Sequence, residues 1–273
     1  MPPPRNHSDK LKGSRVLIIG GSIGIGVGLA SAVLEFGGHV IISSSSAQRI
    51  SQAIDRLRSL HPHTRDDDDD AAIIGIPCDL GNFETLTEQI TSLFAEIATH
   101  LGGPNQLDHV VFTAGDALPI KPLEAFSLPQ IQQAGIVRFF APLVVAQHLR
   151  QNLRPTSGSS FTLTTGGVPH HLMKNWSVAQ AYLGGIESMA RRLAVDLAPV
   201  RVNAIGLGPV ETELWGGTKE AGLYEEVRAR FESKMTTGRV GEVGDVVEAY
   251  LYVLRDWNVS GSIIRSHGGT ILL

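Results

Sequence analysis

The sequence predicts an α/β fold of the doubly wound type, with a seven-stranded parallel sheet and helices on both faces of that sheet. Two observations lead to this prediction. Short apolar runs rich in Val and Ile alternate with longer segments of helical periodicity, and such alternation is typical of parallel sheets built from βαβ units. The 273 residues are 42% hydrophobic but only 6% aromatic, which fits an aliphatic core around one buried sheet.

Each element is predicted from a local pattern. The expected strands are short apolar runs at residues 15–20, 39–43, 72–77, 109–113, 160–164, 201–205 and 262–265. The expected helices follow these strands, to about residue 36, to about residue 60, and over 82–101, 128–152 and 178–198. Neither a repeat nor a domain boundary interrupts the series. We therefore expect one domain over residues 1–273, with residues 1–13 a flexible N-terminal segment.

Composition excludes several classes of partner. The formal net charge of -4 favours neither nucleic acid nor a membrane surface. No apolar run approaches the roughly 20 residues that span a bilayer, and residues 1–13 lack the apolar core of a signal peptide. The one cysteine, Cys78, suits a reducing compartment. No ligand-type side chains stand at metal-binding spacing, so we expect a soluble cytoplasmic protein without a metal site.

A glycine-rich turn marks the candidate nucleotide site. Its sequence, GGSIGIG at residues 20–26, follows the first expected strand and precedes a helix. Glycines there allow a tight turn, and the backbone N–H groups and dipole of the helix N-terminus attract a pyrophosphate. This strand–turn–helix context predicts a Rossmann-type dinucleotide site. Its expected contact residues are Gly20, Ser22, Ile23, Gly24 and Ile25.

The segment after the second expected strand predicts which dinucleotide binds. It reads SSSSAQR over residues 43–49 and has no carboxylate to bind a ribose 2′-hydroxyl or repel a 2′-phosphate. Serine hydroxyls and one guanidinium can bind that phosphate, so we expect NADP(H) with contacts from Ser44, Ser45, Ser46 and Arg49. Serines are also favoured at helix N-caps, and the two roles are compatible because the cap lies beside the phosphate.

The GxxxGxG spacing of the turn resembles that of the short-chain dehydrogenase/reductase family. Further segments spread over nearly the whole chain are similar to the family's motifs: CDL at 78–80, TAG at 113–115, RVNAI at 201–205, GPVET at 208–212 and HGG at 267–269. The resemblance implies that Asp79 and Leu80 lie at the adenine, that Ala114 and Gly115 border the cofactor, and that the loop with Val210 and Thr212 contacts the nicotinamide. It also implies a homo-oligomer, a tetramer, that pairs the two long helices.

The family's Ser and YxxxK catalytic residues have no match at the expected positions. Aligned on the LAVDLAP segment of the last long helix, the Tyr position is Ala179, the Lys position is Leu183, and the Ser position falls just after Thr165. In the alternative alignment Tyr182 is followed four residues later by Ile186. The sequence therefore predicts a divergent member that lacks the Tyr/Lys dyad and reduces simple ketones poorly, since it has no proton donor there.

Five residues are candidates for catalysis in place of the dyad. Arg138 lies in the apolar stretch GIVRFFAPL, where a guanidinium must be paired, so it is either a structural residue or part of the active site. His170 is a candidate proton donor, since imidazole titrates near neutrality. Trp176 either stacks on a flat substrate or anchors its loop. Tyr182 either contacts substrate or packs in the core, and Thr165 can keep the hydroxyl of the absent Ser.

An Arg on the long helix without the dyad resembles a branch of the family in fungal secondary metabolism, the bifunctional reductase/Diels–Alderases of bridged indole-alkaloid pathways. The segment KNWS at 174–177 is similar to the end of their PDPGW motif, with Met173 at its Asp position. This resemblance implies an NADP(H)-binding enzyme acting on an apolar polycyclic metabolite. Three functions stay open: hydride transfer to an activated C=N or C=O acceptor, a redox-neutral cyclisation or isomerisation guided by positioning, and non-catalytic dinucleotide binding.

Overall fold

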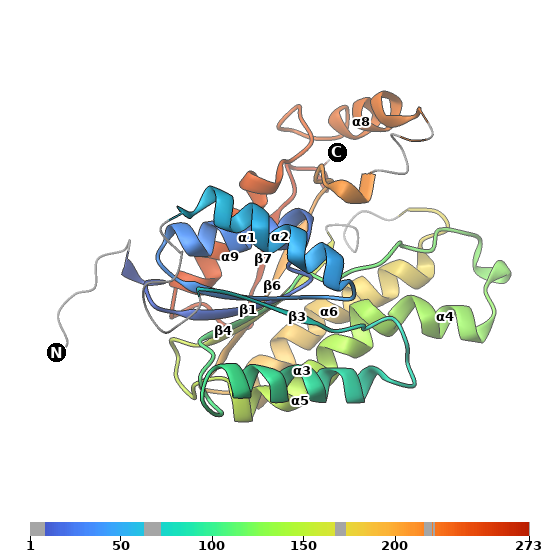
Figure 1. The fold of residues 1–273 in the computed structure, drawn as a ribbon. Coiled ribbons are helices and arrows are strands. Elements are labelled where there is room, and N and C mark those ends of the chain that lie inside the picture. The colour runs from blue at the N-terminus through green and yellow to red at the C-terminus, as the bar shows by residue number, and fades with distance from the viewer. Residues whose placement is uncertain (1–8, 63–71, 167–172, 216–219, 221, 273) are drawn as a thin grey trace.

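The computed structural model confirms a seven-stranded parallel sheet flanked by helices (Figure 1), and it describes residues 9–62, 72–166, 173–215, 220 and 222–272. The sheet order is β3-β2-β1-β4-β5-β6-β7, and every neighbouring pair is parallel. The strands are β1 (Arg15–Ile19), β2 (His39–Ser44), β3 (Ile73–Pro77), β4 (His109–Phe112), β5 (Ser160–Gly166), β6 (Arg201–Leu207) and β7 (Ile263–Ser266). They differ from the predicted ends by one or two residues.

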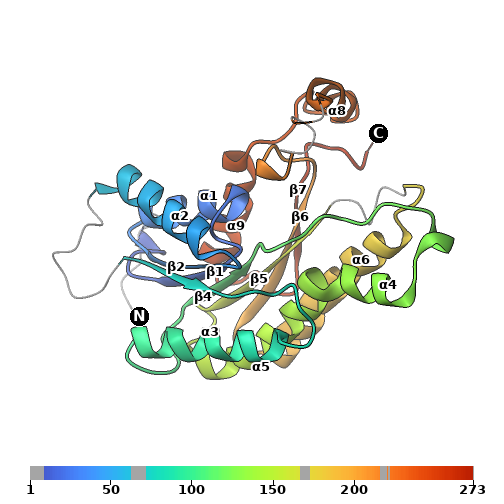
Figure 2. The same cartoon turned by 45° about the vertical axis from the view of Figure 1, so that its right-hand side comes forward.

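Helices cover both faces of the sheet, as Figures 1 and 2 show. One face carries α1 (Gly24–Glu35), α2 (Ala47–Leu60) and α9 (Val243–Arg255). The opposite face carries α3 (Leu86–His100), α4 (Leu128–Gly135), α5 (Ala141–Asn152) and α6 (Ser177–Asp196). A further helix, α8 (Tyr224–Glu232), lies beyond the ends of β6 and β7, apart from both layers. The sequence analysis did not predict α8 or α9.

Two apolar cores follow from the alternation of side chains along the strands. On β1, Leu17 packs towards α3, α5 and α6, whereas Val16 and Ile18 pack towards α1 and α9. Tyr250 of α9 is fully buried, and its hydroxyl lies 2.7 Å from that of Thr164 on β5. The sheet is thus fixed from both sides, with the carboxyl ends of its strands at one common edge.

The long helix expected over residues 128–152 is interrupted in the structure. A π-helical turn at Ile136–Phe140 separates α4 from α5, and the N–H of Ala141 donates to the carbonyl of Ile136, five residues earlier. Pro142 follows directly and has no N–H to donate to the carbonyl of Arg138, so the α-helical ladder cannot continue through this point. Such turns are frequent at functional sites, and this one contains Arg138.

The flexible N-terminal segment was predicted to reach residue 13, but residues 9–13 pack against the fold. Leu11 is fully buried, and the N–H of Gly13 donates to the carbonyl of Gly37 at 2.8 Å. Residues 9–13 therefore belong to the folded domain, because an apolar side chain near the N-terminus completes the core beside α1. No helix of the described residues is long and apolar enough to cross a membrane.

Candidate functional site

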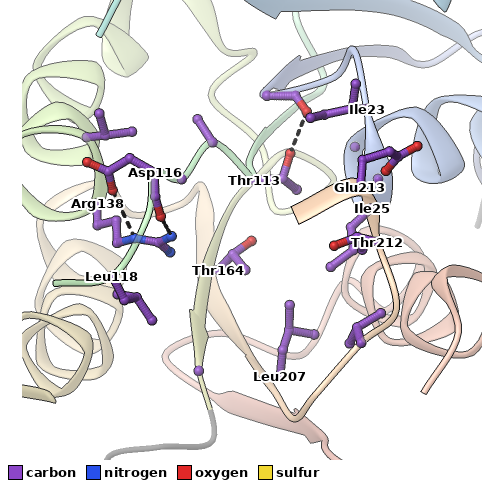
Figure 3. Close-up of a pocket in the computed structure, with 18 of the residues that line it drawn as sticks. Ile23, Ile25, Thr113, Asp116, Leu118, Arg138, Thr164, Leu207, Thr212 and Glu213 are labelled. Carbon is purple, nitrogen blue, oxygen red and sulfur yellow. Dashed lines mark hydrogen bonds and ion pairs between the residues drawn. The ribbon is translucent and has the colours of Figure 1, made fainter. Parts of the chain in front are cut away.

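The site lies where the strand order reverses, between β1 and β4. In doubly wound sheets the crevice at the carboxyl ends of the strands on either side of this point is the usual ligand site. Here the ends of β1, β2, β4, β5 and β6 border one cavity of about 980 Å³. Figure 3 shows Arg138 and Asp116 on one side of this cavity and Ile25, Thr212 and Glu213 on the other.

The glycine turn between β1 and α1 forms a close-packed cradle. Gly20 has φ +93°, and a Cβ there would lie 2.5 Å from the backbone nitrogen of Ala114. A Cβ on Gly26 would lie 2.1 Å from the carbonyl oxygen of Gly20. The N-cap residue of α1, Ile23, provides no side-chain hydrogen bond to the helix, and the first residues of α1, Gly24, Ile25 and Gly26, line the cavity. This arrangement fits the pyrophosphate of a dinucleotide.

The structure brings the predicted cofactor residues together, with one exception. Those that line the cavity are Gly20, Ser22, Ile23, Gly24, Ile25, Ser44, Ser45, Arg49, Asp79, Leu80, Ala114, Gly115, Val210 and Thr212. Ser46 is not among the described lining residues; its hydroxyl accepts a hydrogen bond from the N–H of Arg49 and caps α2. The guanidinium of Arg49 donates to the hydroxyl of Ser45 at 3.0 Å, so a cation stands at the end of β2.

Arg138 is both paired and part of the cavity wall. Its Nε donates to Oδ1 of Asp116 at 3.1 Å, and its Nη2 donates to the Asp116 carbonyl. Its side chain is 20% exposed and that of Asp116 is 36% exposed. Burial lowers the pKa of Arg138, and the charge of Asp116 opposes that shift, so the guanidinium stays charged. Arg138 is therefore a structural residue, through its ion pair with Asp116, and also part of the wall of the candidate site.

Asp116 is a site residue that the sequence analysis missed. It directly follows the TAG segment after β4. This position beside a predicted cofactor segment was the sequence signal that could have identified it. Between it and β4, Gly115 lies against the guanidinium, because a Cβ on Gly115 would come within 2.8 Å of Nη1 of Arg138. Gly115 thus provides the space that Arg138 occupies.

Thr165 and Trp176 also line the cavity, together with Leu183. The hydroxyl of Thr165 is buried and donates to the carbonyl of Leu183 at 2.9 Å, so its proton is already engaged. Trp176 is half-buried at the start of α6, where its indole can contact a flat ligand. Ala179 is buried in α6. His170, the candidate proton donor, lies outside the described residues.

Tyr182 is not among the described residues that line the cavity, and its contacts favour the alternative that it packs in the core. Its hydroxyl donates to the carbonyl of Ile131 in α4 at 3.0 Å. Its ring lies against Gly135, where a Cβ would come within 2.5 Å of Cζ, and 5.4 Å from the ring centroid of Phe139. Burial raises the pKa of Tyr182, so the hydroxyl remains a donor. Tyr182 joins α6 to the segment that positions Arg138.

We expect Tyr182→Phe to lower the free energy of unfolding by about 1 kcal/mol, because the Ile131 carbonyl loses its donor. Gly135→Ala is expected to cost more, since the added methyl group meets the ring of Tyr182. Urea unfolding of both variants measures the two effects. An unchanged midpoint for both would contradict this structural role.

Cys78 lines the cavity but has no reactive thiolate. Burial, with a smaller contribution from the charge of Asp79, raises the pKa of its thiol to about 11. The thiol is therefore protonated at neutral pH and is a poor nucleophile. Within the described part of the chain, no group of three His, Cys, Asp or Glu side chains is placed to hold a metal ion.

Comparison with known proteins identifies the family. The SDR-like Rossmann domain matches residues 7–273. The short-chain dehydrogenase/reductase fsr5 of Gibberella fujikuroi is 51% identical over 97% of each chain. The structure of MalC reductase/Diels–Alderase from Malbranchea aurantiaca has a TM-score of 0.88 at 34% identity and covers 98% of this chain and 100% of its own. A small-chain dehydrogenase in complex with NADPH has a TM-score of 0.74 at 25% identity, over 96% and 100%. The chain belongs to the short-chain dehydrogenase/reductase family.

Proposed function

We propose that this protein is an NADP(H)-dependent reductase that transfers hydride to an activated C=N or C=O acceptor in an apolar polycyclic metabolite. One observation carries the proposal. A single cavity connects the glycine turn and Arg49 with an apolar region that contains the Arg138–Asp116 ion pair. A dinucleotide and a flat substrate can therefore lie side by side in it.

The part of the cavity between the glycine turn and Arg49 has groups for the 2′-phosphate, the pyrophosphate and the adenine of NADP(H). Arg49 and Ser45 would hold the 2′-phosphate, and the first N–H groups of α1 would hold the pyrophosphate. Asp79, whose Oδ1 accepts the N–H of Gly81 at 2.9 Å, would border the adenine. The relative in complex with NADPH supports this choice of cofactor. The reduced cofactor supplies the hydride.

The part of the cavity beside the Arg138–Asp116 pair would hold the hydride acceptor, and its residues explain why an activated acceptor is expected. Its walls are apolar, with Leu118, Ile120, Met173, Trp176 and Leu183 among the lining residues. Hydride addition to a neutral ketone creates an alkoxide that needs a proton donor, and the positions aligned with the family's Tyr and Lys are Ala and Leu. The fixed charge of Arg138 can stabilise an oxyanion as it develops. A cationic C=N acceptor needs no proton when it receives a hydride. For such an acceptor, the carboxylate of Asp116 offsets the positive charge of Arg138.

Cofactor titration tests the proposal. We expect wild-type protein to bind NADPH more tightly than NADH. Arg49→Ala should weaken NADPH binding by about 10- to 100-fold, the value of a charge-assisted hydrogen bond, and should leave NADH affinity unchanged. Arg56→Ala is the matched control, since Arg56 is an exposed cation on the same helix and does not line the cavity. Tighter binding of NADH than of NADPH by the wild type would refute the assignment.

A redox-neutral cyclase is the second candidate. The observation that favours it is the likeness over the full chain to a protein named as a reductase/Diels–Alderase. Product formation with NADP⁺ in place of NADPH, without a change in nicotinamide absorbance, would identify this function. A non-catalytic role would be favoured by a cavity filled with side chains, whereas about 980 Å³ is open here. The homotetramer and the cytoplasmic location stay predictions.

A further inference from the structure

Helix α8 directs one face towards the cavity. Its lining residues are Val227, Arg230 and Phe231, and Lys234 follows just after the helix. The spacing of three and four residues places Val227, Arg230 and Phe231 on a single face of the helix, and Lys234 lines the same cavity from the turn after it. That face combines apolar and cationic groups, so it can contact both a carbon framework and an anion.

These two cations have no anionic partner in the described part of the chain. Neither Arg230 nor Lys234 forms an ion pair there, whereas Arg228 on the same helix pairs with Glu232 at 3.0 Å. The negative end of the helix dipole favours cations near a C-terminus, but this does not explain why both line a cavity. Although the protein has a net charge of -4, the described cavity lining has five basic and three acidic side chains.

Topology separates these cations from the 2′-phosphate site. Arg49 stands at the end of β2, and α8 follows β6, with β1, β4 and β5 between these strands. Four steps between neighbouring strands amount to about 19 Å. The cations of α8 therefore belong to the β6 end of the cavity, away from the 2′-phosphate site, and Figure 2 shows α8 beyond the ends of β6 and β7.

Aromatic side chains lie beside the cations. Trp215 lines the cavity with Phe231, and their ring centroids are 5.6 Å apart. A flat ring system can pack against such a wall. An ionised substituent on that ring system would then be within reach of Arg230 and Lys234.

We propose that α8 recognises an acidic substituent of the substrate through Arg230 and Lys234. The substrate class is then a flat aromatic polycycle that carries a carboxylate or an ionised hydroxyl group. This inference rests on the proposed function, because it assigns a substrate to the same cavity. It adds a specificity determinant that neither the glycine turn nor the Arg138–Asp116 pair provides.

Paired aromatic probes test the proposal. 2-Naphthoate and its neutral near-isostere 2-naphthamide are titrated into the NADPH-saturated protein and followed by calorimetry. We expect the carboxylate to bind at least about tenfold more tightly than the amide, as charge-assisted hydrogen bonds require. The double variant Arg230→Gln/Lys234→Gln should lose this preference. Arg228→Gln removes one positive charge from α8, outside the cavity lining, and should keep the preference. Equal binding of both probes by the wild type would overturn the proposal.

A second arm separates a substrate anion from the cofactor's pyrophosphate. NADPH affinity is measured for the same variants and is expected to stay within about threefold of wild type. A large loss of NADPH affinity in the double variant would assign these cations to the cofactor and overturn the proposal. Failure of the proposed function has a different signature, since the wild type would then not bind NADPH. The carboxylate preference would still be measurable in that case, with the protein alone.

Discussion

Gly26→Ala is expected to reduce NADPH affinity by more than about 100-fold. The added Cβ would lie 2.1 Å from the carbonyl oxygen of Gly20 and 2.9 Å from the Cα of Gly21. Both are backbone atoms of the same turn, so no side-chain rotation relieves the contact. The turn must open, and the N–H groups that it aligns for the pyrophosphate move with it. Fluorescence titration with NADPH measures the loss, and thermal unfolding measures the accompanying destabilisation.

Gly184→Ala is the matched control for this prediction. Gly184 lies inside α6, and a Cβ there meets no atom within 4 Å. The substitution should stabilise the protein by roughly 0.5–1 kcal/mol, the helical advantage of alanine over glycine, and should leave cofactor affinity unchanged. If Gly26→Ala bound NADPH as well as Gly184→Ala did, the glycine turn would not be the pyrophosphate site.

The cofactor half of the site could be predicted from sequence because its residues lie in local motifs. The glycine turn, the segment with Ser45 and Arg49, and the residues after β3, β4 and β6 each directly follow a strand. Parallel strands place all their carboxyl ends at one edge of the sheet. Local patterns therefore determined which side chains meet, although they lie far apart in the chain.

The catalytic half could not be predicted in this way, since it depends on contacts between elements. The phase of α6 decides whether Tyr182 faces the cavity or α4, and a change of one residue in phase rotates a side chain by about 100°. The π-helical turn changes the phase of Arg138 in the same manner. Its partner Asp116 lies on another segment, so only the fold reveals the pair.

Helix α9 was not predicted, although the sequence contains a clear pattern for it. Helix α9 has buried apolar residues at Val246, Val247, Tyr250, Leu251 and Leu254, which is the spacing of an amphipathic helix. A capping box formed by Glu242 and Asp245 marks its start. The sequence thus contained enough information to predict α9.

Arg138→Ala is expected to slow hydride transfer by about 10²- to 10³-fold, the usual effect of removing one preorganised group that stabilises developing negative charge. NADPH affinity should change little, since Arg138 stands on the other side of the cavity from Thr212 and Ile25 (Figure 3). The free energy of unfolding should fall by less than the roughly 3–5 kcal/mol of a fully buried pair, because Asp116 is 36% exposed. Single-turnover oxidation of bound NADPH by 9,10-phenanthrenequinone, an apolar polycyclic diketone, gives the rate.

Gly115→Ala tests the position of Arg138 without removing it. The added Cβ would lie 2.8 Å from Nη1 and 2.9 Å from Cζ of Arg138, so the guanidinium must move while its charge remains. If the position matters, Gly115→Ala and Arg138→Ala should both slow the reaction, and the double variant should be no slower than Arg138→Ala alone, because coupled sites are not additive. A merely structural Arg138 would instead give lower stability with an unchanged rate per folded molecule. Among the catalytic candidates that the structure describes, that result would leave Trp176 on the cavity wall, since the hydroxyl of Thr165 already donates to the carbonyl of Leu183.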